Sequence, residues 1–354
     1  MSFRVSIVIT NHNYARFLAD AIESALAQTH PDCELIVVDD GSTDGSRAVL
    51  EHYPDVTAVL QPNLGQAAAF NAGFERAGGD ACIFLDADDS LAPQAARIVA
   101  ETFERDPRVA KVMYRLRVVD EAGAPTGELK PSGHLPLRSG DLRRYELRFP
   151  FDLTWMATSG NAFRTSALAR IFPVPEDDYP RVGADWYLSH LVPLLGEVAF
   201  LDEVGGSYRV HEANSYERPA GTLDLDQMRN TIVYCRRTAT HLVALAERLD
   251  LEGRPSSAED VLSVSEIWQR IVSLRLAPGQ HPLEDDTRSG LLASGLRAAR
   301  RRFDVAPAHR MLLGAWVAAV ALLPRATLPR LVRRLEPLRG EPWVTRLLRR
   351  LHRP

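Results

Sequence analysis

Short apolar runs and amphipathic stretches alternate through the first hundred residues. The apolar runs are rich in β-branched residues and predict four strands, at Val5–Thr10, Glu34–Val38, Val56–Leu60 and Ala81–Leu85. Between them, apolar positions recur at helical spacing in three stretches, Phe17–Leu26, Ser46–Tyr53 and Gln66–Ala77. Strands that alternate with helices in this way predict right-handed βαβ units and a mostly parallel sheet flanked by helices.

The regular alternation ends near residue 109. Beyond it the pattern predicts two strands, at Lys111–Val119 and Val198–Leu201. It also predicts four helices, at Arg164–Ile171, Asp185–Leu195, Met228–Leu249 and Val261–Leu276. A length of 354 residues suits about two domains. We therefore expect an α/β domain over residues 1–222 and an α-helical C-terminal region over residues 223–354.

The C-terminal region ends in a basic, partly apolar tail. Residues 311–323 are almost wholly apolar, but thirteen residues are too few to cross a bilayer, which needs about 20. From Arg297 onward the chain has 14 arginines and 3 acidic residues, a local charge of +11 in a protein whose net charge is -4. Two interpretations stay open: a buried helix with a solvated basic face, or an interfacial helix on an anionic membrane surface.

The remaining composition narrows the class of protein. The three cysteines, Cys33, Cys82 and Cys235, form no CxxC pair, which argues against structural zinc and a disulfide framework. The N-terminus lacks the charged start and apolar core of a signal peptide, so we expect a cytoplasmic protein, in part peripheral at the inner membrane face.

Polar clusters follow three of the predicted strands. One is the cluster Asp86, Asp88 and Asp89, which comes directly after an apolar strand. Such a cluster suits a divalent cation, since hard oxygen ligands suit Mg²⁺ or Mn²⁺, but it could equally be an acidic turn that caps the helix near Pro93. Similar clusters follow Thr10 and Val38, and in open α/β sheets ligands bind beyond the carboxyl ends of the strands. The convergence favours a ligand site.

Several ordered blocks in the first 215 or so residues carry a resemblance to a known family. They are Ser6–Asn13, Val37–Asp44, Asn63–Gly65 with Asn71–Gly73, Phe84–Asp89, Val182–Leu188 and Tyr208–Ser215. Together, in this order and spacing, they resemble the family 2 inverting glycosyltransferases, whose catalytic domain has the GT-A fold. The resemblance implies a sugar transferred from a nucleoside diphosphate, UDP above all, to a hydroxyl group.

The resemblance also implies a donor site and a metal site. Asp40 would accept a hydrogen bond from the base, Thr10 and His12 would line its pocket, and Asp86 would lie near the ribose or the metal. His12 stands where the family more often has Tyr. Asp88 would be the principal ligand of Mn²⁺ or Mg²⁺, with Asp89 and His211 as further ligands, and Arg209 would contact the diphosphate. Helix capping is the simpler role for Asp40 and Asp89, and a structural role is the simpler one for His211.

The catalytic base implied by the resemblance is Asp185. The family usually has Glu-Asp at this point, and here Ala184 replaces the Glu. One carboxylate suffices to take the proton of the acceptor hydroxyl, so Asp185 fits this role, with helix capping as the alternative. On the acceptor side, the resemblance implies contacts from Gly160, Asn161 and Trp186.

The functional expectation is an inverting, metal-dependent glycosyltransferase that acts on a saccharide or a lipid-linked saccharide in polysaccharide biosynthesis. The alternative is a catalytically silent nucleotide-sugar-binding or scaffold protein on the same fold. A Rossmann oxidoreductase is disfavoured because no G-x-G-x-x-G follows the first strand, where Asn11–Asn13 stands. A nucleotidyltransferase would usually show a Gly-rich basic loop there, and nothing in the chain points to nucleic acid.

Overall fold

The computed structural model describes residues 2–131, 137–212, 214 and 223–335. The chain forms two compact units, the first made of Met1–Arg143 and Thr154–Asn214, the second of Arg144–Leu153 and Ser215–Pro354. The short segment Arg144–Leu153 therefore belongs with the C-terminal helices, although the sequence pattern placed it in the first domain. The expected boundary at residue 222 lies outside the described residues.

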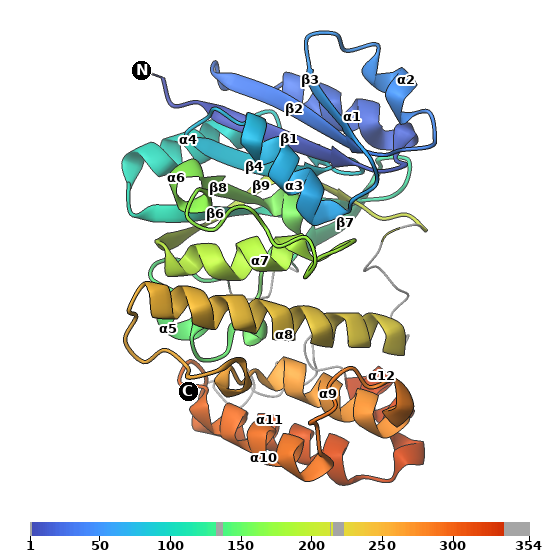
Figure 1. Cartoon of the computed structure of the whole chain (residues 1–354), viewed down its shortest axis with the longest axis vertical. Helices are drawn as coiled ribbons and strands as arrows, with labels where there is room; N and C mark the ends of the chain where they lie inside the picture. Colours follow the sequence, from blue (N-terminus) through green and yellow to red (C-terminus); the bar gives the residue numbers. More distant parts are fainter. Residues whose placement is uncertain (1, 132–136, 213, 215–222, 336–354) are drawn as a thin grey trace. The chain divides into compact units, whose positions relative to one another are not determined.

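The first unit contains one sheet (Figure 1). Its strands are β1 (Val5–Asn11), β2 (Cys33–Asp40), β3 (Thr57–Gln61), β4 (Ala81–Asp86), β5 (Ser90–Leu91), β6 (Val109–Val119), β7 (Pro125–Lys130), β8 (Asn161–Arg164) and β9 (Glu197–Arg209). Their order is β3-β2-β1-β4-β8-β6-β9-β5, with β7 paired to β6. The pairs β1–β2, β1–β4, β2–β3 and β6–β9 are parallel, whereas β8 is antiparallel to both its neighbours. The mostly parallel α/β sheet expected from the sequence is confirmed.

Helices cover the sheet in this unit. They are α1 (Ala15–Leu26), α2 (Ser46–Leu50), α3 (Gln66–Arg76), α4 (Ala95–Arg105), α6 (Thr165–Leu168) and α7 (Ala184–Leu191), with 3-10 turns η2 (Thr158–Gly160) and η3 (Val192–Leu194). Val5, Ile7, Val8 and Ile9 are all 0% exposed, so both faces of β1 are covered. This is why these strands read as continuous apolar runs instead of alternating ones.

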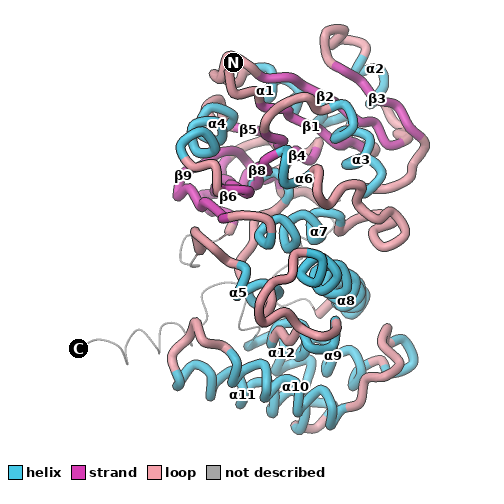
Figure 2. Tube along the Cα trace, turned by 60° about the vertical axis from the view of Figure 1, so that its left-hand side comes forward, coloured by secondary structure: helices cyan, strands magenta, loops and turns pink. Residues whose placement is uncertain are grey.

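The second unit is helical (Figure 2). It contains most of α5 (Arg143–Glu146), α8 (Leu225–Arg248), α9 (Val264–Leu276), α10 (Arg288–Arg301), α11 (Pro307–Leu322) and α12 (Leu328–Leu335), with 3-10 turns η1 (Pro150–Asp152), η4 (Ala258–Asp260), η5 (Pro278–Gln280) and η6 (Arg325–Thr327). Its core is built around fully buried Ile232, Ile267, Ile271 and Val317. No single described helix is long and apolar enough to cross a membrane. Taken together, α11 and Arg325–Arg333 reach the required length and apolar composition, but a bend of 119° separates them.

Asp152 explains why its segment joins this unit. Its carboxylate accepts the backbone N–H groups of Val264 and Ser265 at 2.9 and 2.8 Å, which caps the start of α9. The same carboxylate lies 3.0 Å from the guanidinium of Arg302. A cap between residues more than a hundred positions apart leaves no local pattern in the sequence.

Candidate active site

The strand register places the predicted polar clusters together. Thr10 at the end of β1 lies opposite Val38 of β2 on one side and Asp86 of β4 on the other. The loops that follow these three strands therefore leave the sheet at one edge, as the sequence predicted.

Asp40 sits in a dense set of hydrogen bonds. One carboxylate oxygen accepts the Gln61 side-chain amide at 2.7 Å and the Leu64 N–H at 2.8 Å, and the other accepts the Gly65 N–H at 2.8 Å. The residue is 4% exposed. A carboxylate offers about four acceptor positions, so one position on Oδ2 stays available for a base N–H.

His12 is oriented by the same strand end. Its Nδ1 lies 2.7 Å from the carbonyl oxygen of Asp40, and since a carbonyl only accepts, Nδ1 carries the proton. In the neutral ring Nε2 then accepts from the side-chain amides of Asn13 at 3.1 Å and Asn63 at 3.2 Å. The imidazole is thus fixed beside Asp40, where the resemblance placed the base pocket.

The carboxylate cluster after β4 carries strongly perturbed acids. Burial and the neighbouring charge of Asp88 raise the pKa of Asp89 to about 8. Burial raises the pKa of Asp86 well above its usual range, and repulsion from Asp88, Asp89 and Asp185 adds to the effect. The Ser159 hydroxyl accepts the backbone N–H of Asp86 at 3.2 Å, and hydroxyls of η2 partly offset both shifts. Without a cation, the cluster favours bound protons.

Asp88 and His211 are the pair that fits a metal. Asp88 Oδ2 lies 3.0 Å from His211 Nε2, and Asn214 Nδ2 lies 3.5 Å from the same oxygen. Two adjacent ligands of an octahedral ion at about 2.1 Å stand about 3.0 Å apart, so the spacing suits one shared cation. Among the described residues, no three His, Cys, Asp or Glu side chains form a ready cage. Mg²⁺ and Mn²⁺ are commonly held by one or two side chains, with water and substrate phosphate in the rest of the shell, so a pair of ligands would be enough for either ion.

Asp89 follows Asp88 in the chain, and its carboxylate bonds the backbone of β9. Its Oδ1 accepts the backbone N–H of Arg209 at 2.9 Å, which ties the strand β9 to the cluster. Its Oδ2 is buried and makes no bond of good geometry, although Ser159 is close enough to lower its pKa somewhat. Whether Asp89 also ligates the metal stays a prediction.

Arg209 is held by several hydrogen bonds inside the protein. Its guanidinium donates to the Asp88 carbonyl at 3.0 Å, to the Glu121 carbonyl at 3.0 Å and to the Asp20 carboxylate at 2.8 Å. Its centre also lies 4.7 Å from the Phe17 ring. Each of the three guanidinium nitrogens makes one of these bonds, so Arg209 holds the backbone of Asp88 in place, and its expected contact with the diphosphate stays a prediction.

Asp185 stands in the first turn of α7, close enough to Asp86 to raise the pKa of that carboxyl. Burial raises the pKa of Asp185 above its usual range, while nearby backbone N–H groups, His190 and Lys111 lower it. Gly183 precedes the helix, and its φ of 97° belongs to the left-handed region that favours glycine. Gln66 Oε1 accepts the N–H groups of Gly183 at 2.9 Å and Ala184 at 3.1 Å.

An aromatic and basic cluster behind Asp185 was not found by sequence reasoning. Lys111 of β6 is 0% exposed, and its Nζ lies 4.0 Å from the centre of the Trp155 ring and 3.3 Å from the carbonyl oxygen of Ser189. Trp155 and Trp186 both pack against His190, at 5.6 and 5.7 Å between ring centres. The only sequence signal was a lysine inside an apolar strand. Trp186, expected on the acceptor side, is half-exposed next to Asp185.

Gly160 and Asn161, expected on the acceptor side, are buried at the turn η2. Asn161 is 1% exposed, and its amide donates to the carbonyls of Ala157 and Thr158 at 2.7 and 3.3 Å. A Cβ on the buried Gly160 would stand 2.9 Å from Met156 Cε. Both residues shape the turn η2 from inside, and their expected contact with an acceptor stays a prediction.

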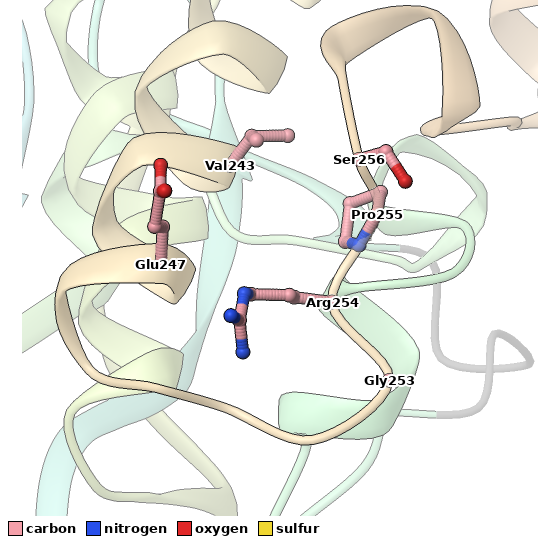
Figure 3. A pocket seen from close by; sticks show the side chains of 6 residues that line it. All are labelled: Val243, Glu247, Gly253, Arg254, Pro255 and Ser256. Atoms are coloured by element: carbon pink, nitrogen blue, oxygen red, sulfur yellow. The ribbon is translucent and has the colours of Figure 1, made fainter.

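Two open hollows lie elsewhere in the described residues. One, of about 400 Å³, lies in the second unit between the end of α8 and the loop after it, with Arg254 and Glu247 in its wall (Figure 3). Arg254 bonds the Asp250 carboxylate at 2.9 Å within that loop. The other, of about 540 Å³, is lined in part by Pro93, Arg117 and Glu203. Neither includes a predicted site residue.

The comparison with protein families decides the class of the first unit. A family model described as glycosyl transferase family 2 matches residues 6–172. These residues belong to glycosyl transferase family 2. The family 2 domain so defined contains Asp40, Asp86 and Asp88, whereas Asp185 and His211 lie beyond the matched residues.

Relatives extend the match. The uncharacterized glycosyltransferase alr2836 of Nostoc sp. is 38% identical over 218 residues, which cover 60% of this chain and 66% of that protein. The chondroitin synthase of Escherichia coli is 37% identical over 123 residues, 34% of this chain and 18% of that one. The chain thus spans just under two thirds of the first relative and under a fifth of the second.

A solved structure shares the fold. The crystal structure of S. aureus TarS 1-349 in complex with UDP aligns with a TM-score of 0.52 and 16% identity, covering 93% of this chain and 91% of that chain. The family 2 domain therefore has the GT-A-like α/β fold expected from the sequence.

Proposed function

We propose that the protein is an inverting, metal-dependent glycosyltransferase that moves a sugar from a UDP-linked donor to a hydroxyl of a saccharide or lipid-linked saccharide. The observation that carries the proposal is the closeness of two carboxyls. Asp185 on α7 lies near enough to Asp86 of the family 2 carboxylate cluster to perturb its pKa. An acceptor base beside the donor cluster is the arrangement that single displacement requires.

The donor assignment draws support from the site and from the relatives. Asp40 keeps one acceptor position for a base N–H, and His12 presents a fixed ring beside it. Structures of TarS contain UDP and UDP-GlcNAc. The E. coli relative is a chondroitin synthase, which favours a saccharide acceptor here as well.

In the proposed reaction, Asp185 accepts the proton of the acceptor hydroxyl. The hydroxyl oxygen attacks the anomeric carbon of the donor sugar from the face opposite the nucleotide, which leaves as the nucleoside diphosphate. Burial keeps the pKa of Asp185 raised, which makes the carboxylate a better proton acceptor. Asp88 and His211 would hold the cation, which when bound stabilises negative charge on the leaving diphosphate. Arg209 keeps the Asp88 backbone in place.

The test is nucleotide release from a panel of UDP-Glc, UDP-GlcNAc, UDP-Gal and GDP-Man, with Mn²⁺ or with EDTA. We expect Mn²⁺-dependent release from a UDP-sugar. Asp185→Asn should lower it at least 100-fold, since a general base contributes about 10² to 10⁴, and leave UDP affinity unchanged. Asp177→Asn, at an exposed loop position of the same unit, is the control. Tight UDP binding with no release from any donor would support the silent scaffold instead.

A further inference from the structure

The outer side of α11 is an exposed apolar face. Met311 is 75% exposed, Leu312 39% and Leu322 60%, and the exposed Ala315 lies between them at helical spacing. The opposite side of the helix, with Leu313, Val317 and Val320, is buried in the core of the second unit. A helix that is apolar all round normally has both faces covered. Here one face remains to be covered.

The neighbouring helix α10 widens this face. Leu296 is 45% exposed and lies beside Gly314, where an added Cβ would stand 3.5 Å from its side chain. Five of the eight large apolar side chains that are well exposed among the described residues belong to α10, α11 and the residue after it. The helices α10 and α11 run side by side in both views (Figures 1 and 2). We call this surface, made of Leu296, Met311, Leu312, Ala315, Leu322 and Leu323, the apolar face.

Arginines flank the apolar face at both ends. Arg297, Arg300 and Arg301 are exposed at the end of α10, and Arg300 shares the outer stripe of Leu296, four residues earlier. At the far end, three more arginines bond the carbonyls at the ends of helices. Arg275 donates to the Val320 and Leu323 carbonyls at 2.6 Å, and Arg288 donates to the Ala321 carbonyl. Arg325 donates to the Leu276 carbonyl at 2.9 Å. The neighbouring Arg288 and Arg325 add to burial in lowering the pKa of Arg275, which shows how closely these charges gather.

Acidic groups do little to neutralise this surface. Residues 287–335 contain ten arginines and one acidic residue, Asp304, which pairs with Arg302 at 2.7 Å. In the preceding loop, Asp286 is held by Arg270 and His281. Only the exposed Glu284 and Asp285 lie nearby in sequence. The face is therefore apolar in the middle and cationic at its ends.

We propose that α10 and α11 form a docking surface for an anionic lipid bilayer, with α11 lying in the plane of the interface. Apolar side chains would enter the boundary between headgroups and acyl chains while the arginines meet lipid phosphates. A second copy of this face carries the same positive charge and would be repelled. The 16 residues of α11 span about 24 Å, too short for a hydrocarbon core of about 30 Å.

Vesicle binding by the full chain tests this surface independently of transferase activity. We expect co-sedimentation with phosphatidylcholine vesicles that contain 25% phosphatidylglycerol, little binding to pure phosphatidylcholine, and release at 1 M NaCl. Met311→Glu should weaken binding at least tenfold, and Leu322→Gln should weaken it too. The matched control is Leu26→Glu, an exposed apolar position of α1 at 57% exposure.

The charges are tested separately. Arg300→Glu should weaken binding by more than fivefold, because one basic residue near an anionic surface contributes about fivefold. Arg105→Glu, an exposed arginine of α4, should change nothing. Four results would overturn the proposal: no binding of the intact chain, equal binding of Met311→Glu, a dimer in solution that Met311→Glu dissociates, or retention on membranes after a carbonate wash at pH 11.

Discussion

Asp88 organises the candidate site at the scale of single residues. Its carboxylate meets His211, its carbonyl meets Arg209, and both partners come from a segment about 120 positions later. Two of its neighbours in the cluster, Asp86 and Asp89, prefer to be protonated without a cation. Repulsion among these acids is therefore built into the cluster, and a bound cation would relieve it.

The raised pKa of Asp89 predicts how stability depends on pH in the metal-free protein. The pKa of Asp89 in the folded protein, about 8, exceeds its ordinary value of 3.8. Between these two pH values the folded state therefore binds more protons than the unfolded state, and the free energy of unfolding falls as pH rises from about 4 to about 8. Asp89→Asn keeps the acceptor for Arg209 N–H and removes the titration. We expect its melting temperature to exceed that of the wild type by a few degrees at pH 8 and by less at pH 5. Thermal unfolding in EDTA measures both, and an equal difference at the two pH values would refute the linkage.

The charge of Lys111 predicts a shift in the pH profile of turnover. Lys111 lowers the pKa of Asp185 against the effect of burial, so Lys111→Met should raise that pKa and move the acid limb of kcat to higher pH. The donor KM should stay close to that of the wild type. The matched control is Arg105→Met, at an exposed position of α4. An unmoved acid limb would assign Lys111 a purely structural role.

Among elements, α3 links the two halves of the site. Its first residues, Gly65 and Gln66, give one N–H to Asp40 and a side-chain acceptor to the start of α7, which carries Asp185. The same helix end therefore positions the proposed base pocket and the proposed catalytic base.

Loss of that acceptor should affect turnover more than binding. Gln66→Leu leaves two N–H groups of α7 without their partner, which costs about 0.5–2 kcal/mol of stability. We expect kcat to fall at least tenfold because small displacements of a catalytic group are expensive, with UDP affinity nearly unchanged. Gln66→Glu keeps the acceptor and should restore most of the rate. If Gln66→Leu turns over like the wild type, α7 does not depend on this cap.

Elements with strong local patterns could be predicted from the sequence. The strands β1 to β4 and the helices α1, α3, α8 and α9 appear within a few residues of their expected positions, because apolar periodicity fixes them locally. The strand β7 was missed although it pairs with the preceding strand β6, because Pro125–Lys130 has no apolar run. The short strands β5 and β8 were missed because strands far away in the sequence stabilise them. The same holds in the site: carboxylates in motifs were found, whereas Gln66 and Lys111 act across about 70 to 120 positions.

At the scale of the whole molecule, the acidic and basic parts of the sequence fall in different structural units. The first unit carries the acidic cluster of the family 2 domain, and the second carries arginines around an exposed apolar face. Sequence alone left the apolar stretch open between a buried helix and an interfacial one. The structure shows a helix with one face buried and the other exposed, so the buried description holds for one side of α11, and the interfacial description stays a proposal for the other.

The central claim is that Asp88 and His211 hold a divalent cation together with a nucleoside diphosphate. The most direct measurement is the loss of the free Mn²⁺ signal in electron paramagnetic resonance, titrated with UDP on the wild type, Asp88→Asn and the exposed control Asp55→Asn. We expect one Mn²⁺ bound per chain with UDP in the wild type and the control, and at least tenfold weaker binding in Asp88→Asn. Equal Mn²⁺ affinity in Asp88→Asn would contradict the account.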